Sequence, residues 1–379
     1  MPDSLKNLIP DRLNDPARFA QIAERHLRAF RWEKQGRIPL GLIVNDPEYS
    51  QGITLDQWLN PEVFLRLQAS NLRDTLEVGS DVMPSIALNH MGNALVPSAF
   101  GAEITIPGDR VTSIQDSGPW ISPVLRDIRE TDDLSFSPIP SGLVCEAERF
   151  MRCCRHHLPE WVRVVSPAKL GPFSLAELLR GSAFYLDLAV DPDRCRRLLD
   201  LCTSGLIAVE QYLRNGTGPS SDEHYSEFGI RGPGIRIGED SLINVSQAMI
   251  REFALPRIDR MAQAFGGRIY VHFCTLEKSR SEHVYEALAQ ASCVFAASSQ
   301  FGFAYYEKNV DQLEGRLAIE SLYGDGIDSL IHKHGSFENW AREFVPRFKD
   351  RSGLILYFEV PSVEAGKTIW EVWQAAHER

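Results

Sequence analysis

Hydrophobic and polar positions along this chain follow two periods, one typical of amphipathic helices and one typical of short buried strands. Apolar residues recur at helical spacing in residues 15–35, and an aspartate and a proline begin the run. The same spacing predicts a helix over 54–79 and a long helix from a cap near Asp191 to a glycine at Gly216. The pattern therefore predicts a helix-rich chain with strands between the helices.

Short apolar runs separate these helices, and after residue 233 runs and helices alternate regularly. Strand–helix alternation is typical of a parallel sheet with helical crossovers. Eight such units predict a closed (β/α)8 TIM barrel, whose site lies at the carboxyl ends of the strands. The fold class predicted for residues 1–379 is thus α/β, as a single barrel domain with an N-terminal helical extension. The eight strands are predicted near residues 38, 83, 162, 235, 269, 293, 316 and 354.

Residues 91–160 interrupt this regularity. They are rich in proline, glycine and serine, and few periodic runs occur among them. A span of that length with little regular structure is unusual in a compact domain and more often shapes a site than connects two elements. We therefore expect this segment to cover part of the pocket.

Charge and composition narrow the function classes. The 379 residues include 40 basic and 51 acidic side chains, a net charge of −11, which argues against nucleic-acid and anionic membrane surfaces as partners. No apolar run approaches eighteen residues, and the N-terminus has no signal-peptide pattern. The seven scattered cysteines are typical of reduced thiols. A cytoplasmic location is expected.

The stretch GGRIYVHFCTL, residues 266–276, carries the strongest chemical signal. Its apolar centre predicts a strand that ends in His272 and Cys274. Side chains two residues apart on a strand point to the same face, so an imidazole and a thiol lie side by side and can form half of a zinc site. The alternative is that Cys274 is a small buried hydrophobe and His272 a hydrogen-bonded core histidine.

Five segments, in order and with matching spacing, resemble the uroporphyrinogen decarboxylase superfamily. The resemblance extends from about Arg37 to the C-terminus. The superfamily also contains zinc-dependent methyltransferases that demethylate corrinoid proteins. The resemblance implies a distorted (β/α)8 barrel, and a homodimer is a possible assembly because members of this family often form dimers. The segments are GPFSLAELLRG, DLAVDPDRCRRLLDLCT, EDSLINVSQAMIREFALPRI, RIYVHFC and SGLILYFEV.

Two departures weaken the decarboxylase interpretation. The family's arginine-rich motif after strand one, which grips substrate carboxylates, is replaced by residues 45–49, which are acidic and lack arginine. The family's essential aspartate after strand two is absent from NHMGNALVPSAFG. A neutral amide there supplies no charge to stabilise a cationic intermediate. In this interpretation the proton donor is His90, Glu239 or Asp240, and the substrate-binding residues are Asn45, Asn89, Asn93 and Arg236.

The methyltransferase branch has a His-x-Cys pair after strand five and a further cysteine at strand eight. His272 and Cys274 match the pair, but Tyr357, Phe358 and Glu359 stand where the cysteine is expected. A carboxylate can bind zinc, so Glu359 is predicted as the third ligand, with Glu239 as a second candidate.

Three functions stay open from the sequence. The favoured one is a methyltransferase that moves a methyl group between a corrinoid, on a partner protein, and a thiol at a zinc site. The second is decarboxylation of a uroporphyrinogen-like tetrapyrrole carboxylate. The third is a barrel that binds a small ligand or a corrinoid protein without catalysis. None of the three calls for a nucleic acid or a membrane.

Overall fold

Strands appear at all eight predicted positions of the chain. The computed structural model describes every residue except 1–4, 6, 35, 46–52, 55–58, 89–90, 106–109, 112–119, 168, 218–221, 227, 276, 323–325 and 379. The strands at the predicted positions are β1 (Leu40–Val44), β3 (Ser85–Ala87), β7 (Arg163–Val165), β10 (Ile235–Gly238), β11 (Ile269–His272), β12 (Val294–Ser298), β13 (Ala318–Leu322) and β14 (Leu354–Val360).

Six of these strands form one parallel sheet in the order β1-β14-β13-β12-β11-β10. Strands β3 and β7 form a separate parallel pair, and a parallel bridge between Leu170 and Gly238 continues the pairing beyond β10. The predicted α/β architecture with a parallel sheet is therefore confirmed. The ladders between described residues do not close into a ring, so closure of the barrel stays a prediction.

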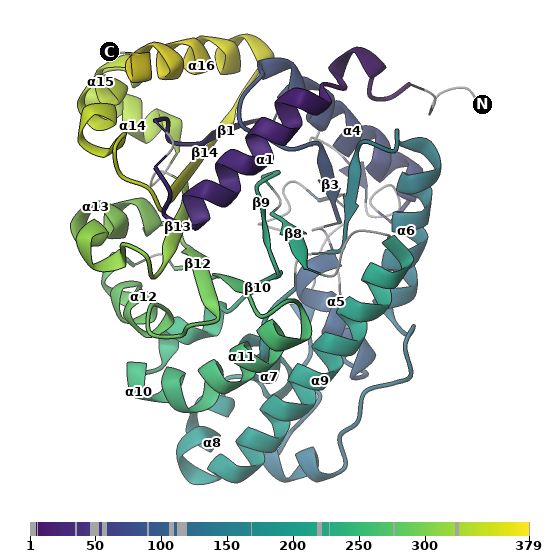
Figure 1. Cartoon of the computed structure of the whole chain (residues 1–379). Coiled ribbons are helices and arrows are strands. Elements are labelled where there is room, and N and C mark those ends of the chain that lie inside the picture. Colours follow the sequence, from purple (N-terminus) through teal and green to yellow (C-terminus); the bar gives the residue numbers. More distant parts are fainter. Residues whose placement is uncertain are drawn as a thin grey trace.

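Helices surround the strands (Figure 1). Short 3-10 and π-helical segments, including η5 (Asp240–Asn244), occur between them. The described α-helices are α1 (Pro16–Phe30), α4 (Pro61–Val78), α5 (Gly92–Ala99), α6 (Leu143–His157), α7 (Pro172–Arg180), α8 (Phe184–Val190), α9 (Pro192–Thr217), α10 (Gln247–Met249), α11 (Leu255–Ala264), α12 (Glu282–Leu288), α13 (Gly302–Leu313), α14 (Ile327–His334), α15 (Phe337–Phe348) and α16 (Val363–Glu378). No helix in the described part of the chain combines the length and apolar character needed to cross a membrane.

The segment 91–160 contains more regular structure than the sequence predicts. Helices α5 and α6 begin and end it, because their buried faces (Leu95, Val96 and Phe150, for example) pack into the core despite the flanking glycines and prolines. Short antiparallel pairs also occur in and near this region. They are β2 (Ile53–Thr54) with β5 (Arg110–Val111), β4 (Ile104–Thr105) with β6 (Trp120–Ile121), and later β8 (Glu223–Tyr225) with β9 (Arg231–Pro233).

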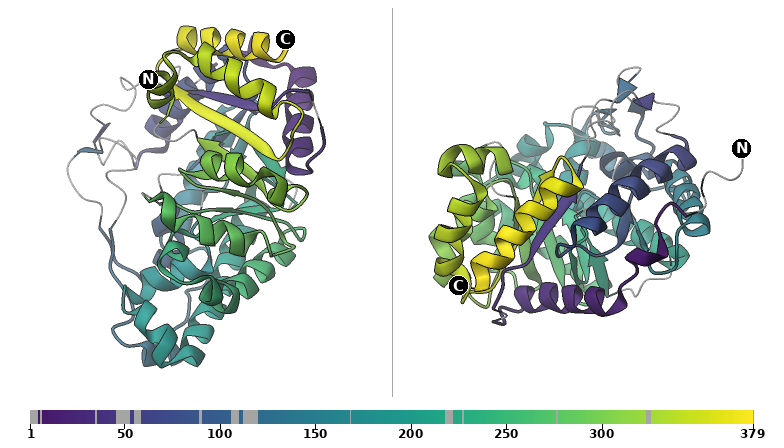
Figure 2. Two further views of the ribbon diagram at one scale, coloured as in Figure 1. Left: turned by 90° about the vertical axis from the view of Figure 1, so that its left-hand side faces the viewer. Right: turned by 90° about the horizontal axis from the view of Figure 1, so that it is seen from above.

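The two ends of the chain pack together at strand β1. Helix α16, yellow in Figure 2, lies along β1. The Trp373 indole N–H donates to the Ile38 carbonyl at 3.2 Å, and the Arg37 guanidinium lies over the Trp370 ring at 4.6 Å from its centroid. These contacts fix β1, the edge of the six-stranded sheet, against the last helix.

A buried charge network fixes helix α1 to the same strand. The Asp81 carboxylate accepts hydrogen bonds from Arg25 and Arg37 and from the Leu40 backbone N–H. His26 is fully buried beside it, with Nε2 2.9 Å from the Asp81 carbonyl and Nδ1 accepting the Arg231 N–H at 3.2 Å. One ring nitrogen therefore donates and the other accepts, which only the neutral imidazole can do.

We expect acid to destabilise the fold through His26. Burial lowers its pKa from 6.5 to about 4, so between these values the unfolded chain takes up a proton that the folded chain does not. The contribution to stability is complete above pH 6.5 and is lost as the pH falls toward 4, on the order of 3 kcal/mol. Urea unfolding at a series of pH values should show a flatter dependence for His26→Gln than for the wild type. An equally steep dependence in both proteins would contradict this assignment.

Candidate metal centre

The pairing of β10 with β11 brings two short chemical motifs to one edge of the sheet. Gly238 lies opposite His272 in this parallel pair. Beyond it the Glu239 N–H donates to the His272 carbonyl at 2.7 Å, and the Cys274 N–H donates to Asp240 Oδ1 at 2.7 Å. Because the strands are parallel, the residues that follow both of them lie at the same carboxyl edge.

Three side chains of different chemistry converge there. The ligand atoms of Asp240, His272 and Cys274 all lie within 4.8 Å of one another, and His272 Nε2 is 3.1 Å from Cys274 Sγ. Zinc binds oxygen, nitrogen and sulfur donors at about 2.0–2.3 Å, so neighbouring donors in its shell lie roughly 3–4 Å apart. The set fits a zinc ion with three protein ligands and an open fourth position.

The far side of the His272 ring is held by the neighbouring strand. His272 Nδ1 lies 2.7 Å from Ser298 Oγ at the end of β12, and the Tyr270 hydroxyl donates to the same oxygen at 2.5 Å. A ring nitrogen occupied in this way leaves the other one directed at the ligand group.

In the absence of a bound cation, burial of this group favours the uncharged forms of its side chains. Burial and, secondarily, Arg236 lower the pKa of His272 to about 3, so its imidazole is neutral at pH 7. Burial, with the Asp240 charge as a smaller cause, raises the pKa of Cys274 to about 11, so the group is a thiol. Burial also raises the pKa of Asp240. A bound cation would favour the thiolate and the carboxylate.

Glu239, the neighbour of Asp240, is directed away from this group. Its carboxylate is fully buried and accepts the Phe173 N–H at 3.1 Å and the Ser174 N–H at 2.8 Å, at the first turn of α7. These N–H groups have no partner within the helix, and the positive end of the helix dipole favours a carboxylate there. Gly171 permits the approach, because a Cβ on it would lie 2.4 Å from Oε1. Burial nevertheless raises the pKa of Glu239 to about 7.

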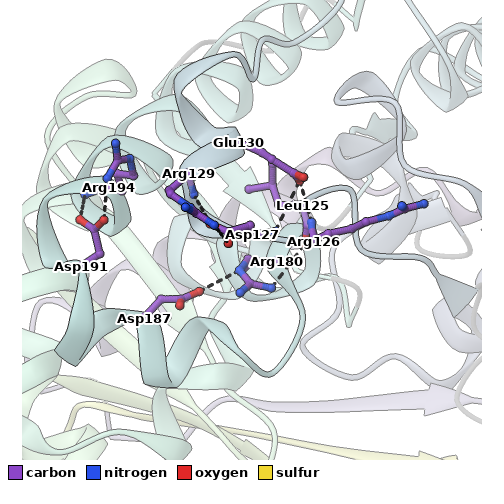
Figure 3. Close-up of polar contacts among 9 residues, drawn as sticks. All are labelled: Leu125, Arg126, Asp127, Arg129, Glu130, Arg180, Asp187, Asp191 and Arg194. Carbon is purple, nitrogen blue, oxygen red and sulfur yellow. Dashed lines mark hydrogen bonds and ion pairs between the residues drawn. The ribbon is translucent and has the colours of Figure 1, made fainter.

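The other end of α7 is fixed by a group of ion pairs (Figure 3). Arg180, in the last turn, donates to Asp187 Oδ2 at 2.7 Å and to the Leu125 carbonyl at 3.5 Å. Asp127 and Arg129 lie beside them and bind one another. Helix α7 is therefore held at both ends. Glu239, which follows β10, contacts the first turn of this fixed helix.

The structure does not bring Glu359 into the ligand group. Its side chain is exposed on β14, where Asn45 Nδ2 donates to Oε2 at 3.3 Å. Strands β12 and β13 lie between β14 and β11 in the sheet. Asp240, predicted from the sequence as an acid rather than a ligand, occupies the position beside His272 and Cys274 that Glu359 was expected to fill.

The remaining predicted residues are dispersed. Arg236 lies on β10 with its guanidinium 5.3 Å from the Tyr270 ring centroid, one pleat below the ligand group. Asn93 is exposed in the first turn of α5. Asn89 and His90 lie outside the described residues.

Ser298 and Gln300 were not anticipated from the sequence. Both stand at the carboxyl end of the strand predicted near residue 293, and a serine and a glutamine directly after an apolar run are the signal that could have found them. Gln300 Oε1 accepts the Thr275 N–H at 2.9 Å, and its side chain also hydrogen-bonds the Cys274 thiol.

Comparison with known proteins shows a shared fold but no matching family. No protein-family model and no curated protein matches the chain. Among solved structures, a methyltransferase from Methanosarcina mazei superposes with a TM-score of 0.64 at 15% sequence identity, over 94% of this chain and 98% of that one. At this identity the similarity shows that the two chains share a fold over almost their whole length.

We expect Glu239 to stabilise the fold rather than bind metal. Glu239→Ala leaves two buried N–H groups without an acceptor, and each costs about 1–3 kcal/mol, so the free energy of unfolding should fall by about 3 kcal/mol. Glu239→Gln retains one oxygen acceptor and should lose less. Urea unfolding measures both values. A metal affinity that falls in Glu239→Gln while its stability is unchanged would contradict this assignment.

Proposed function

We propose that this chain is a methyltransferase of the uroporphyrinogen decarboxylase superfamily that binds zinc through Asp240, His272 and Cys274. The observation that carries the proposal is the convergence of these oxygen, nitrogen and sulfur donors within 4.8 Å at the carboxyl edge of the sheet. The fold shared with a methyltransferase and the five sequence segments quoted above support it. Asp240 takes the part that a strand-eight cysteine has in the zinc-dependent branch.

The ligand set suits the activation of a thiol substrate. A zinc ion held by Asp240, His272 and Cys274 would have an open coordination position for a thiol substrate and would supply the Lewis acidity that makes that thiol a nucleophile toward a methyl group. His272 offers a neutral ring nitrogen, and the Asp240 carboxylate both binds the Cys274 backbone N–H and faces its sulfur. These contacts keep the oxygen, nitrogen and sulfur donor atoms close to one another. The methyl donor that we propose is a corrinoid carried by a partner protein.

Metal analysis tests the ligand set. Protein purified without chelator should contain about one zinc ion per chain, and Cys274→Ala, His272→Ala and Asp240→Asn should each lose most of it, because three ligands are the minimum for a catalytic site. Cys145→Ser is the matched control, since Cys145 is also exposed but lies on α6. Wild-type protein that neither contains nor takes up zinc would refute the proposal.

Methyl transfer can be measured directly. With methylcobalamin and a small thiol, the absorbance change of demethylation should appear with the zinc-loaded wild type. It should fall by about two orders of magnitude or more in Cys274→Ala, because the thiol would no longer be held and ionised. Cys145→Ser should retain the wild-type rate. If zinc-loaded protein binds methylcobalamin without demethylating it, the proposed reaction is wrong.

A decarboxylase remains the second candidate because of one observation. The Arg236 charge lies close enough to His272, Cys274 and Asp240 to act on the pKa of each, although burial outweighs it and raises the pKa of Cys274 and of Asp240. A guanidinium in that position favours an anionic substrate. Release of carbon dioxide from a uroporphyrinogen, retained in Cys274→Ala and lost in Arg236→Ala, would support it over methyl transfer. Binding of a corrinoid that survives loss of both His272 and Cys274, without turnover of either substrate, would support a non-catalytic role.

A further inference from the structure

The end of β12 contacts two members of the ligand group from the side opposite Asp240. We propose that Ser298, anchored by Tyr270, is a positioning residue that fixes His272 in the tautomer with the proton on Nδ1 and the Nε2 lone pair directed at Cys274 and Asp240. The value of this tautomer for metal binding rests on the function proposed above. The hydrogen-bond geometry that defines the tautomer does not depend on that function.

The geometry of Ser298 is set by the backbone. Ser298 lies opposite His272 in the β11–β12 ladder, and its carbonyl accepts the Phe273 N–H at 3.0 Å. The residue is 1% exposed and Tyr270 is fully buried, so water cannot readily replace either hydroxyl. The ladder therefore holds Oγ at 2.7 Å from His272 Nδ1 without a mobile segment between them.

Tyr270 contacts the same hydroxyl of Ser298. Its own hydroxyl donates to Ser298 Oγ at 2.5 Å. The ring is held by His224, stacked at 5.6 Å between centroids, and by the Arg236 guanidinium. A serine oxygen has two acceptor sites. With Tyr270 on one of them, the other is placed to accept the His272 Nδ1–H, and in the proposed tautomer Nε2 is the ring's lone-pair nitrogen.

Gln300 orients the sulfur from the same strand end. Its Oε1 accepts the Thr275 N–H at 2.9 Å, and its side chain also hydrogen-bonds Cys274 Sγ. Residues at the end of β12 thus contact both the nitrogen and the sulfur ligand, while β10 supplies the oxygen ligand.

Ser298→Ala tests the assignment against a closely matched control. Ser299→Ala removes a hydroxyl one residue away that binds Tyr285 and the Phe301 N–H instead. Zinc affinity, measured by competition with a chromophoric chelator, should fall about 10–100-fold in Ser298→Ala, the usual cost of losing an outer contact to a ligand. It should be unchanged in Ser299→Ala.

A second readout does not depend on metal. Nitrogen-15 NMR of histidine-labelled, metal-free protein reports the protonated ring nitrogen, and His272→Gln identifies the signal. The wild type and Ser299→Ala should carry the His272 proton on Nδ1, whereas Ser298→Ala should shift it toward Nε2. A wild type that binds no zinc but shows this shift would refute the proposed metal function and leave the positioning role standing. Wild-type tautomer and wild-type zinc affinity in Ser298→Ala would overturn the inference.

Tyr270→Phe keeps the assignment testable if Ser298→Ala does not fold. It removes one hydroxyl and retains the ring that packs against His224. Circular dichroism establishes folding before either measurement. We expect the same direction of change in tautomer and zinc affinity, with a smaller amplitude, because Ser298 remains but loses its donor. A folded Tyr270→Phe protein with wild-type values in both measurements would equally overturn the inference.

Discussion

The parallel ladder between β10 and β11 is the constraint on which the candidate site depends. Its register places Gly238 opposite His272, and two further backbone contacts, from Glu239 to His272 and from Cys274 to Asp240, continue the alignment past the strand ends. A shift of one residue in this register would move Asp240 away from the Cys274 N–H, from which its carboxylate accepts a hydrogen bond. The ligand group therefore exists only because the backbone pairing is fixed.

The two carboxylates that follow β10, Glu239 and Asp240, make different contacts. Glu239 is buried against the first turn of α7, where backbone N–H groups and the helix dipole compensate for its desolvation. Asp240 is directed to the thiol and the imidazole. Because α7 is also held at its C-terminal end by Arg180 and Asp187, the support for the site is rigid. A rigid support keeps metal ligands within the narrow range of distances that coordination requires.

Much of the fold could be predicted, since it follows from local periodicity. The eight strand positions, the long helix ending near Gly216 and the α/β class are observed as predicted. Segment 91–160 has more regular structure than predicted, because burial against the core stabilises α5 and α6 in spite of the glycine and proline residues there. Tertiary packing overrides weak local propensity in such cases.

The candidate site could be predicted only in part. His272 and Cys274 are two residues apart on one strand, so their common face is a local property of the sequence. The third donor comes from another strand, and spacing along the chain does not reveal which carboxylate will lie there. The sequence favours Glu359 as this carboxylate, with Glu239 second, but two strands separate β14 from β11, whereas β10 pairs with β11 directly and brings Asp240 to it.

Interactions between residues close in the chain specify the elements and the imidazole–thiol pair, so the sequence reveals both. Long-range contacts are needed to place Asp240 beside the pair, to bury Glu239 against the first turn of α7, and to bring Ser298 and Gln300 into contact with His272 and Cys274. These outcomes depend on strand order and register. Both are set by packing and hydrogen bonding between segments 25 or more residues apart, as between Cys274 and Asp240 with a separation of 34.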